Sequence, residues 1–167
     1  LAYQFAFNKP NTVVFFAPDI PAKGYKSFAL KQAKTEAREG FVYADKTFMS
    51  NRYFDVMLDA NGNISSIFDK SAKREVLQTG KVANQLIAFE DKPLGYDAWD
   101  INVFYQDKAW EINDIRSMEV VESGPVRACI RIVRGFSDST ITNDLYIYND
   151  IPRMDFKTVV DWKEMET

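Results

Sequence analysis

The segment 89–102 combines side-chain types that suit the recognition of sugars. It reads Phe-Glu-Asp-Lys-Pro-Leu-Gly-Tyr-Asp-Ala-Trp-Asp-Ile-Asn, so carboxylates and large aromatic rings surround a turn that contains proline and glycine. Aromatic faces pack on sugar C–H groups, while Asp and Asn accept hydrogen bonds from sugar hydroxyls. The candidate substrate-binding residues are therefore Tyr96, Asp97, Trp99 and Asp100.

Two other interpretations of this loop stay open. Carboxylates about 5 to 9 Å apart can catalyse the hydrolysis of a glycosidic bond, and Asp97 and Asp100 are close enough in sequence to meet in a turn. Neither has a neighbour that would separate their pKa values, which disfavours a self-sufficient hydrolase. The structural alternative is that Trp99 fills the edge of a sheet while both Asp residues cap turns.

The lack of histidine excludes several kinds of catalytic and metal site. With 0 His and a single cysteine, the chain cannot build a Ser-His-Asp or Cys-His arrangement, or a zinc site with imidazole ligands. Cys129 lies in an apolar strand pattern, so we expect a buried, inert thiol. We predict no catalytic residue and no metal ligand in this chain.

One cysteine cannot close a disulfide either, which fits a cytoplasmic location.

The charge balance disfavours strongly electrostatic partners. Lys and Arg total 21 against 24 Asp and Glu, a formal net charge of −3. We therefore expect neither nucleic acid nor an anionic membrane as a partner. Arg127, Arg131 and Arg134 recur at strand spacing and could clamp an anion, although a solvated sheet face is favoured.

Alternating side chains predict that strands position the loop. Phe54, Val56 and Leu58 share one face of an expected strand, and Asn61-Gly62 is a strong hairpin signal before the return strand 64–68. Turn signals recur at the intervals of an antiparallel meander, without strand–helix–strand alternation. The predicted fold class is all-β, an antiparallel β-sandwich. Further expected strands are Asn84–Phe89, Met118–Glu122, Val126–Arg134, Ile141–Tyr148 and Met154–Trp162.

The chain is expected to divide into two parts. Residues 1–46 would form a small β element and a connector, and residues 47–167 would form the first part of the sandwich. Within the first part, strands are expected at Val13–Ala17 and at residues 25–30.

The connector carries a conflict between local propensity and packing. Residues 27–39 are rich in Ala, Lys, Glu and Gln, which favours a helix, but its apolar face would be mostly alanine and would pack weakly. A polar connector is favoured, with a short helix as the rival, so whether residues 31–40 are helical stays open.

Both ends lack the usual terminal features. The chain begins at Leu1 without a methionine or a leader, and it stops at Thr167 without a turn or a tail. We expect a fragment of a longer protein.

Seven stretches, in order and spacing, resemble the region after the catalytic domain in glycoside hydrolase family 38, the α-mannosidases. The likeness is to the bacterial and cytosolic branch, and it covers nearly the whole chain. The stretches are Ala17–Lys26, Asn51–Phe54, Asp59–Lys70, Asn84–Leu86, Phe89–Pro93, Tyr96–Ile101 and Pro152–Thr158.

The resemblance implies a galactose-mutarotase-like β-sandwich, of which this chain would be the beginning and thus part of a supersandwich. It also implies retaining hydrolysis of α-mannosides by a zinc ion and an Asp nucleophile. Both belong to the family's N-terminal α/β domain, whose motifs do not occur here. In the family, loops of the β region close over the catalytic pocket, and Tyr96–Asp100 is the best match for such a loop.

Three functional hypotheses follow. The first is a non-catalytic accessory domain whose partners are its own catalytic domain and mannose-containing glycans, with zinc expected only in that domain. The second is a carbohydrate-binding module whose site is the loop at Tyr96–Asp100. The third is a purely structural scaffold between domains.

Overall fold

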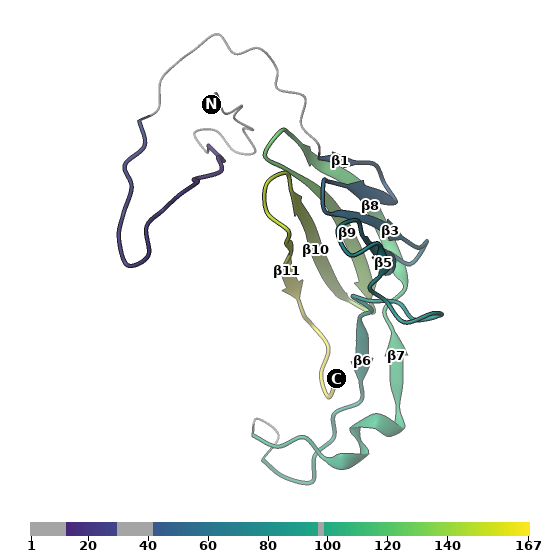
Figure 1. Ribbon diagram of the computed structural model, residues 1–167. Helices are drawn as coiled ribbons and strands as arrows, with labels where there is room; N and C mark the ends of the chain where they lie inside the picture. The colour runs from purple at the N-terminus through teal and green to yellow at the C-terminus, as the bar shows by residue number, and fades with distance from the viewer. Residues whose placement is uncertain (1–12, 30–41, 97–98) are drawn as a thin grey trace.

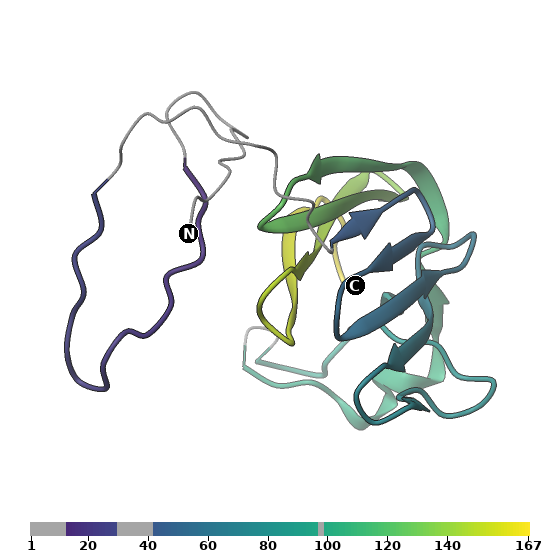
Figure 2. The same ribbon diagram turned by 45° about the horizontal axis from the view of Figure 1, so that its top comes forward.

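The structure, a computed structural model, describes residues 13–29, 42–96 and 99–167. Every strand pairing in it is antiparallel, and no α-helix occurs within the described residues. Two sheets face each other, and a third, smaller sheet projects from one end (Figures 1 and 2). The predicted all-β antiparallel sandwich is confirmed.

The first sheet has five strands in sequence order and contains the predicted hairpin. In Figure 2 its strands are blue and lie in front of the green and yellow strands. The hairpin that Asn61-Gly62 predicted is formed by β3 and β4. The strands are β1 (Tyr43–Ala44), β2 (Phe48–Ser50), β3 (Phe54–Leu58), β4 (Ile64–Asp69) and β5 (Arg74–Glu75).

The second sheet has four long strands in the order β11-β10-β9-β8. Each corresponds to an expected strand and differs from it by a few residues at the ends. Alternating residues of β9 and β10, such as Ile130 and Leu145, face the first sheet and are fully buried. The strands are β8 (Asp114–Ser123), β9 (Arg127–Phe136), β10 (Ser139–Tyr148) and β11 (Met154–Asp161).

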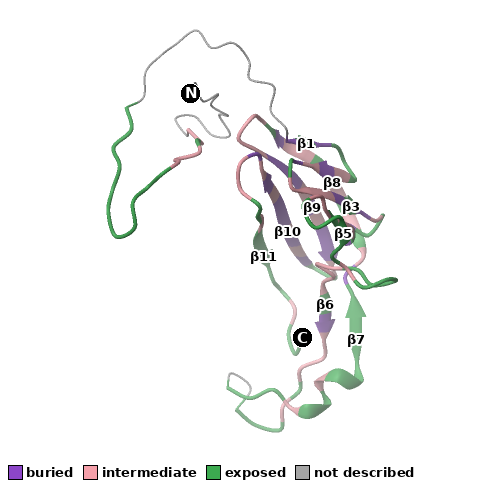
Figure 3. Ribbon diagram, in the orientation of Figure 1, coloured by how far each residue is buried: buried purple, intermediate pink, exposed green. Residues whose placement is uncertain are grey.

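The main core lies between these two sheets. Aliphatic side chains of both sheets form one cluster, and Figure 3 shows the burial concentrated along β9 and β10. Removing such side chains from water is the main stabilising contribution to a sandwich of this size. The fully buried members are Met49, Val56, Ile64, Ala128, Ile130, Ile132, Leu145 and Ile147.

A buried asparagine ties the two sheets together. The Oδ1 atom of Asn51 accepts hydrogen bonds from the backbone N–H groups of Tyr53 and Phe54, at 2.8 and 2.7 Å. Its Nδ2 atom donates to the carbonyl oxygen of Tyr148 in β10, at 2.8 Å. Asn51 is almost completely buried, so each of these bonds is made away from water, where an unpaired group is costly.

A buried arginine holds the turn between β3 and β4. Arg134 is fully buried, and its Nε and Nη2 atoms donate to the carbonyl oxygen of Asn61 at 3.3 and 3.1 Å. Within the turn, Oδ1 of Asp59 accepts from the backbone N–H groups of Asn61 and Asn63, at 2.9 and 2.8 Å. Gly62 has φ +70°, which lets the chain pass close to Arg134.

The third sheet has two strands, β6 (Ile87–Phe89) and β7 (Ala109–Glu111), joined through a 3₁₀ helix, η1 (Val103–Asp107). We call residues 87–111 the arm. The strand expected at 84–89 is shorter because Asn84 adopts φ +58° and donates from Nδ2 to Oδ1 of Asn143, at 2.9 Å. Figure 1 shows the arm extending away from the sandwich.

Two expectations for the N-terminal part are not met. Residues 13–29 contain no strand, so the predicted strand at Val13–Ala17 is wrong, as is the second strand over its described part, 25–29. These stretches have apolar strand composition, but a strand also requires a hydrogen-bonded neighbour. Residues 30–41, with the alternative of a helix at 31–40, lie outside the described residues, and the division at residue 46 stays a prediction.

The anion clamp that the sequence disfavoured is not formed, and the favoured interpretation, a solvated sheet face, is wrong for Arg134, which is fully buried. Arg127 donates from Nε to both carboxylate oxygens of Glu122, at 2.9 and 3.0 Å, and Arg131 binds Asp144 through two hydrogen bonds of 2.6 and 2.8 Å. Arg134 points to the opposite face, into the sandwich. Arg127 and Arg131 are paired with carboxylates of the protein itself, whereas Nη1 of the buried Arg134 has no hydrogen-bond partner among the described residues. The three cations do not converge on a common point.

No helix among residues 13–29, 42–96 and 99–167 is long and apolar enough to cross a bilayer.

Gly62 and Gly80 provide a matched test of the turn. Both have positive φ, but a Cβ at Gly62 would lie 2.8 Å from Nη2 of Arg134 and from Cγ2 of Ile132, whereas a Cβ at Gly80 meets nothing within 4 Å. We expect Gly80→Ala to lower the free energy of unfolding by about 1 kcal/mol through backbone strain alone. Gly62→Ala should cost about 1–3 kcal/mol more because it also overpacks the core. Urea unfolding measures both, and equal losses would contradict the close packing at Gly62.

Candidate functional site

The base of the arm is fixed to the sandwich by a second, small core. Ala88 of β6 and Ile112 after β7 are buried against Ile141 of β10. Three aromatic rings, those of Trp110, Phe136 and Trp162, form a row next to this small core. The ring of Trp110 lies 6.2 Å from that of Phe136, which stacks on Trp162 at 5.5 Å with an interplanar angle of 6°. The arm therefore leaves the sandwich in a defined direction.

The middle of the arm is held by local contacts. Asn102 caps η1, because its Oδ1 accepts from the backbone N–H of Phe104 at 3.2 Å. The rings of Phe89 and Tyr105 meet edge to face at 5.2 Å and join β6 to η1.

Charged side chains line the arm beside its tip. Glu90 pairs with Lys108 at 2.9 Å and with Lys92 at 3.2 Å. The hydrogen bond from Lys108, followed by that from Lys92, lowers the pKa of Glu90, and the hydrogen bond to Glu90 raises the pKa of Lys92. Both groups therefore keep their charges over a wide pH range around neutral.

The tip is a turn whose aromatic side chains stand in solvent. The carbonyl oxygen of Tyr96 accepts from the backbone N–H groups of Trp99 and Asp100, at 2.7 and 3.0 Å, and Tyr96 itself has φ +59°. The side chains of Tyr96 and Trp99 are 83% and 90% exposed. Figure 3 shows this end of the arm as exposed. The turn thus presents two large rings to solvent.

The structural interpretation of Trp99 is wrong. A ring that filled the edge of the sandwich would be buried, and Trp110 and Trp162, not Trp99, make those contacts. The carboxylate of Asp100 is exposed and bonds to no described residue. Asp97 lies outside the described residues, so its distance from Asp100 is not defined.

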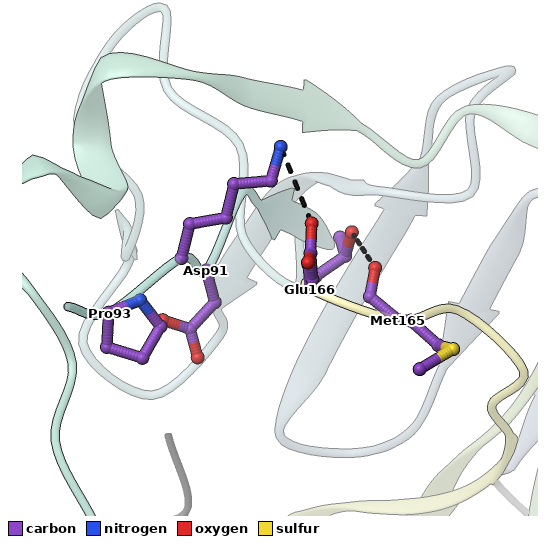
Figure 4. A pocket seen from close by; sticks show the side chains of 6 residues that line it. Asp91, Pro93, Met165 and Glu166 are labelled. Atoms are coloured by element: carbon purple, nitrogen blue, oxygen red, sulfur yellow. Dashed lines mark hydrogen bonds and ion pairs between the residues drawn. The ribbon is translucent and has the colours of Figure 1, made fainter. Parts of the chain in front are cut away.

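A cavity of about 600 Å³ adjoins the arm and is shown in Figure 4. Asp91 and Pro93 line one side and Met165 and Glu166 the other, and the backbone N–H of Asp91 donates to the carbonyl oxygen of Glu166 at 2.8 Å. Lys92 reaches Glu166 at 3.5 Å across the cavity. The cavity combines carboxylates, an ammonium and apolar groups.

The titratable groups with shifted pKa values are poorly suited to catalysis. The hydrogen bond from Ser66, followed by the backbone N–H of Leu77, lowers the pKa of Glu75 to about 2. Burial, followed by the negative charge of Asp144, raises the pKa of the Cys129 thiol to about 12. Acid–base and nucleophilic catalysis require pKa values nearer to neutral. Cys129 is fully buried and inert, as predicted.

The chain's own residues do not fit a zinc ion. The sequence has 0 His, and its one cysteine is buried. In the described part of the chain, no group of three or more His, Cys, Asp or Glu could hold a metal ion. Zinc in proteins is held by histidine, cysteine or carboxylate ligands, usually four protein ligands in structural sites and three in catalytic ones.

Sequence reasoning missed two features of this region. Apolar residues around the tip are exposed, although their types predict burial; they are Leu94, Ile101, Val103 and Phe104. The segment 165–167 also lies against residues 91–93, and no local pattern marks a contact between segments so far apart in sequence.

Comparison with known sequences places this architecture in a family. The sequence model described as the C-terminal domain of glycosyl hydrolases family 38 matches residues 49–167, from β2 to the last residue. The chain belongs to glycosyl hydrolase family 38. The resemblance seen in the sequence is thereby confirmed, and the region of the family to which it belongs is the C-terminal domain.

Relatives within the family are α-mannosidases. The chain is 31% identical over 122 residues to alpha-mannosidase G of Dictyostelium discoideum and 26% identical over 118 residues to human alpha-mannosidase 2C1. The mouse alpha-mannosidase 2C1 is 25% identical over 118 residues. Each match covers 70% of the chain but 11% of the relative, so the chain spans about a tenth of the length of these enzymes.

Several stretches that carry the family resemblance have structural roles. Asn51–Phe54 contains the asparagine that joins the sheets, and Asp59–Lys70 contains the turn at Gly62. Asn84 bonds to the core-side Asn143. Tyr96–Ile101 differs, because Tyr96, Trp99 and Ile101 are all exposed. The exposed side chains of Tyr96, Trp99 and Ile101 therefore contribute little to the core.

Substitutions of two tryptophans test whether the tip of the arm stabilises the fold. We expect Trp99→Ala to change the free energy of unfolding by less than about 0.5 kcal/mol, because the ring contacts solvent. Trp162→Ala should cost about 1–2 kcal/mol, because it removes the ring stacked on Phe136. Thermal or urea unfolding of both variants measures the two changes in the free energy of unfolding. A large loss for Trp99→Ala would mean that the tip is structural.

Proposed function

We propose that the chain is a non-catalytic β-domain part of a retaining, zinc-dependent α-mannosidase, and that the tip of its arm contributes to the substrate site. The observation that carries the proposal is the exposure of Tyr96 and Trp99 on a turn with an anchored base. Membership of glycosyl hydrolase family 38 supplies the enzyme class.

The chemistry of the tip suits a mannoside. The flat faces of Tyr96 and Trp99 can pack on the C–H groups of a sugar ring, and the carboxylates of Asp97 and Asp100 can accept hydrogen bonds from its hydroxyls. A loop that approaches a catalytic pocket also excludes water, which strengthens polar contacts to the substrate. The role proposed for these residues is therefore substrate binding.

The reactive groups would come from elsewhere in the enzyme. This chain offers no histidine for zinc, so the metal and the Asp nucleophile are assigned to the N-terminal catalytic domain of the family. The exposed apolar residues beside the tip, Leu94, Val103 and Phe104, would be covered by that domain, since patches of this kind mark contact surfaces. The partners are then the catalytic domain and mannose-containing glycans, in a cytoplasmic enzyme of mannose metabolism.

A kinetic comparison in the complete enzyme tests the tip. Trp99→Ala should lower kcat/KM for an aryl α-mannoside by about tenfold or more, the effect of losing one contact made in the transition state. The control is Tyr25→Ala, which removes an equally exposed aromatic ring from the segment 13–29, outside the arm in sequence, and which should leave kcat/KM unchanged.

Three results would count against the proposal. They are unchanged kinetics for Trp99→Ala, hydrolysis of an aryl α-mannoside by this chain alone, and stoichiometric zinc bound to it. The stretch of gene upstream provides an independent check. It should encode an α/β domain with His and Asp residues that can ligate zinc.

A second candidate is a carbohydrate-binding module whose site is the loop at Tyr96–Asp100, favoured by the exposed ring of Trp99 and by the cavity at residues 91–93. Asp91, Lys92 and Glu166 offer hydrogen-bonding groups there, with Pro93 and Met165 as apolar contacts. Titration of mannose should then change the tryptophan fluorescence of this chain, and Trp99→Ala should abolish the change. No response at high sugar concentration would exclude this candidate and leave the contact with the catalytic domain, or a purely structural role, as the function of the arm.

A further inference from the structure

The loop that carries the exposed tip is closed by one pair of facing residues. We call residues 91–107 the tip loop, which Figure 1 shows beyond β6 and β7. These strands pair Phe89 with Ala109, and one position further out the backbone N–H of Glu90 donates to the carbonyl oxygen of Lys108 at 3.0 Å. Among the described residues, this is the last backbone hydrogen bond that joins the two sides of the arm.

The side chains of the same two residues reinforce this closure. Nζ of Lys108 donates to Oε1 of Glu90 at 2.9 Å, and it also lies 4.9 Å from the centre of the Trp110 ring. Trp110 in turn neighbours Phe136 of β9. A charge-assisted hydrogen bond and a cation–π contact together hold an ammonium group in place. Lys108 thus links the beginning of the tip loop to the ring that anchors the arm.

The exposure of this pair argues for a role in geometry more than in overall stability. The side chain of Lys108 is 57% exposed and that of Glu90 is 29% exposed. Ion pairs as open to water as this one contribute little to folding stability, because solvent screens them and long side chains lose entropy. A bond that closes a loop nevertheless restricts the conformations of that loop. The pair acts beside the ring contact of Phe89 with Tyr105, which holds η1.

We propose that Glu90 and Lys108 are positioning residues that hold the tip loop in the orientation in which Tyr96 and Trp99 meet the substrate. The inference rests on the proposed function of the tip. A loop that is already closed loses less conformational freedom on binding, whereas an open loop must first be ordered, which weakens affinity. Neither positioning residue has to touch the sugar. Loss of the pair should therefore raise KM more than it lowers kcat.

Lys92 bonds to the same carboxylate but cannot close the loop. Its Nζ lies 3.2 Å from Oε1 of Glu90, which is two positions away on the same side of the arm. A contact between neighbours on one side does not restrain the distance to the other side. A substitution of Glu90 would disturb both ammonium groups, whereas a substitution of Lys108 removes only the contact across the loop. Lys108 is therefore the position to change.

Two substitutions of Lys108 in the complete enzyme test the inference. Lys108→Met keeps an apolar stem beside Trp110 but removes the ammonium, and it should lower kcat/KM for an aryl α-mannoside by about fivefold, mainly through KM. Lys108→Arg retains the charge and the contact with the ring, so its kcat/KM should stay within about twofold of the wild-type value. Hydrogen exchange measured by mass spectrometry should be faster in residues 91–107 of Lys108→Met and unchanged in the strands of the sandwich.

Arg153→Met is the matched control. Arg153 is 58% exposed, pairs with Asp155 at 2.8 Å and lies 5.3 Å from the centre of the Tyr148 ring, so it makes the same two kinds of contact as Lys108. It belongs to the turn between β10 and β11, which Figure 1 shows at the end of the sandwich away from the arm. Its loss should leave kcat/KM and the hydrogen exchange of the tip loop unchanged.

A double substitution separates failure of this inference from failure of the proposed function. If Lys108 acts through the tip, Lys108→Met should have little further effect on kcat/KM in the Trp99→Ala enzyme. An equal loss in both backgrounds would overturn the inference alone. The same holds if Trp99→Ala is impaired and Lys108→Met is not.

Three further outcomes would also refute the positioning role. They are a loss of kcat/KM that Lys108→Arg shares, an equal loss for Arg153→Met, and unaltered hydrogen exchange of the tip loop in Lys108→Met. Unchanged kinetics for Trp99→Ala would instead refute the proposed function of the tip, and the positioning role with it.

Discussion

The burial of aliphatic side chains between two sheets is the constraint on which the rest of the structure depends. Ile130, Ile132 and Leu145 of the long strands pack with Met49 and Val56 of the short ones, and none of them is exposed. The two sheets are joined at their turns by buried polar side chains, Asn51 at one turn and Arg134 at another. An unsatisfied polar group in such a core is costly, so these bonds fix where the turns lie.

The arm depends on this sandwich for its direction. Its base shares a small core with Ile141 of β10 and continues into the row of rings at Trp110, Phe136 and Trp162. Its tip has no comparable support, and its large side chains face solvent. A rigid base with an exposed aromatic tip is the arrangement expected of a recognition element, because the scaffold limits the entropy lost on binding. This is why the proposed substrate contact and the proposed contact with a catalytic domain fall on the same segment.

The sequence predicted the fold well where local pattern and tertiary packing agree. Alternation in the strands from Val126 to Trp162 predicts sheet faces that the structure contains, because a residue on the wrong face would lose its burial. The pattern failed at Val13–Ala17, whose apolar composition is typical of a strand but which has no hydrogen-bonded partner in the described structure. The expected solvated face failed for Arg134, which is fully buried and bonds to the carbonyl oxygen of Asn61, because spacing alone does not reveal what lies across the sandwich.

The residues themselves determined the chemistry that is possible. Without histidine and with one cysteine, the chain cannot form the common nucleophilic and zinc sites, and its acidic, aromatic segment is suited to sugars. Only the tertiary structure decided how these residues are presented. It showed that Trp110 and Trp162 fill the edge of the sandwich while Trp99 is exposed, and that residues 91–93 meet residues 165–167. The physical reason is that burial and long-range contacts depend on how distant segments pack, which the order of residue types along one segment does not encode.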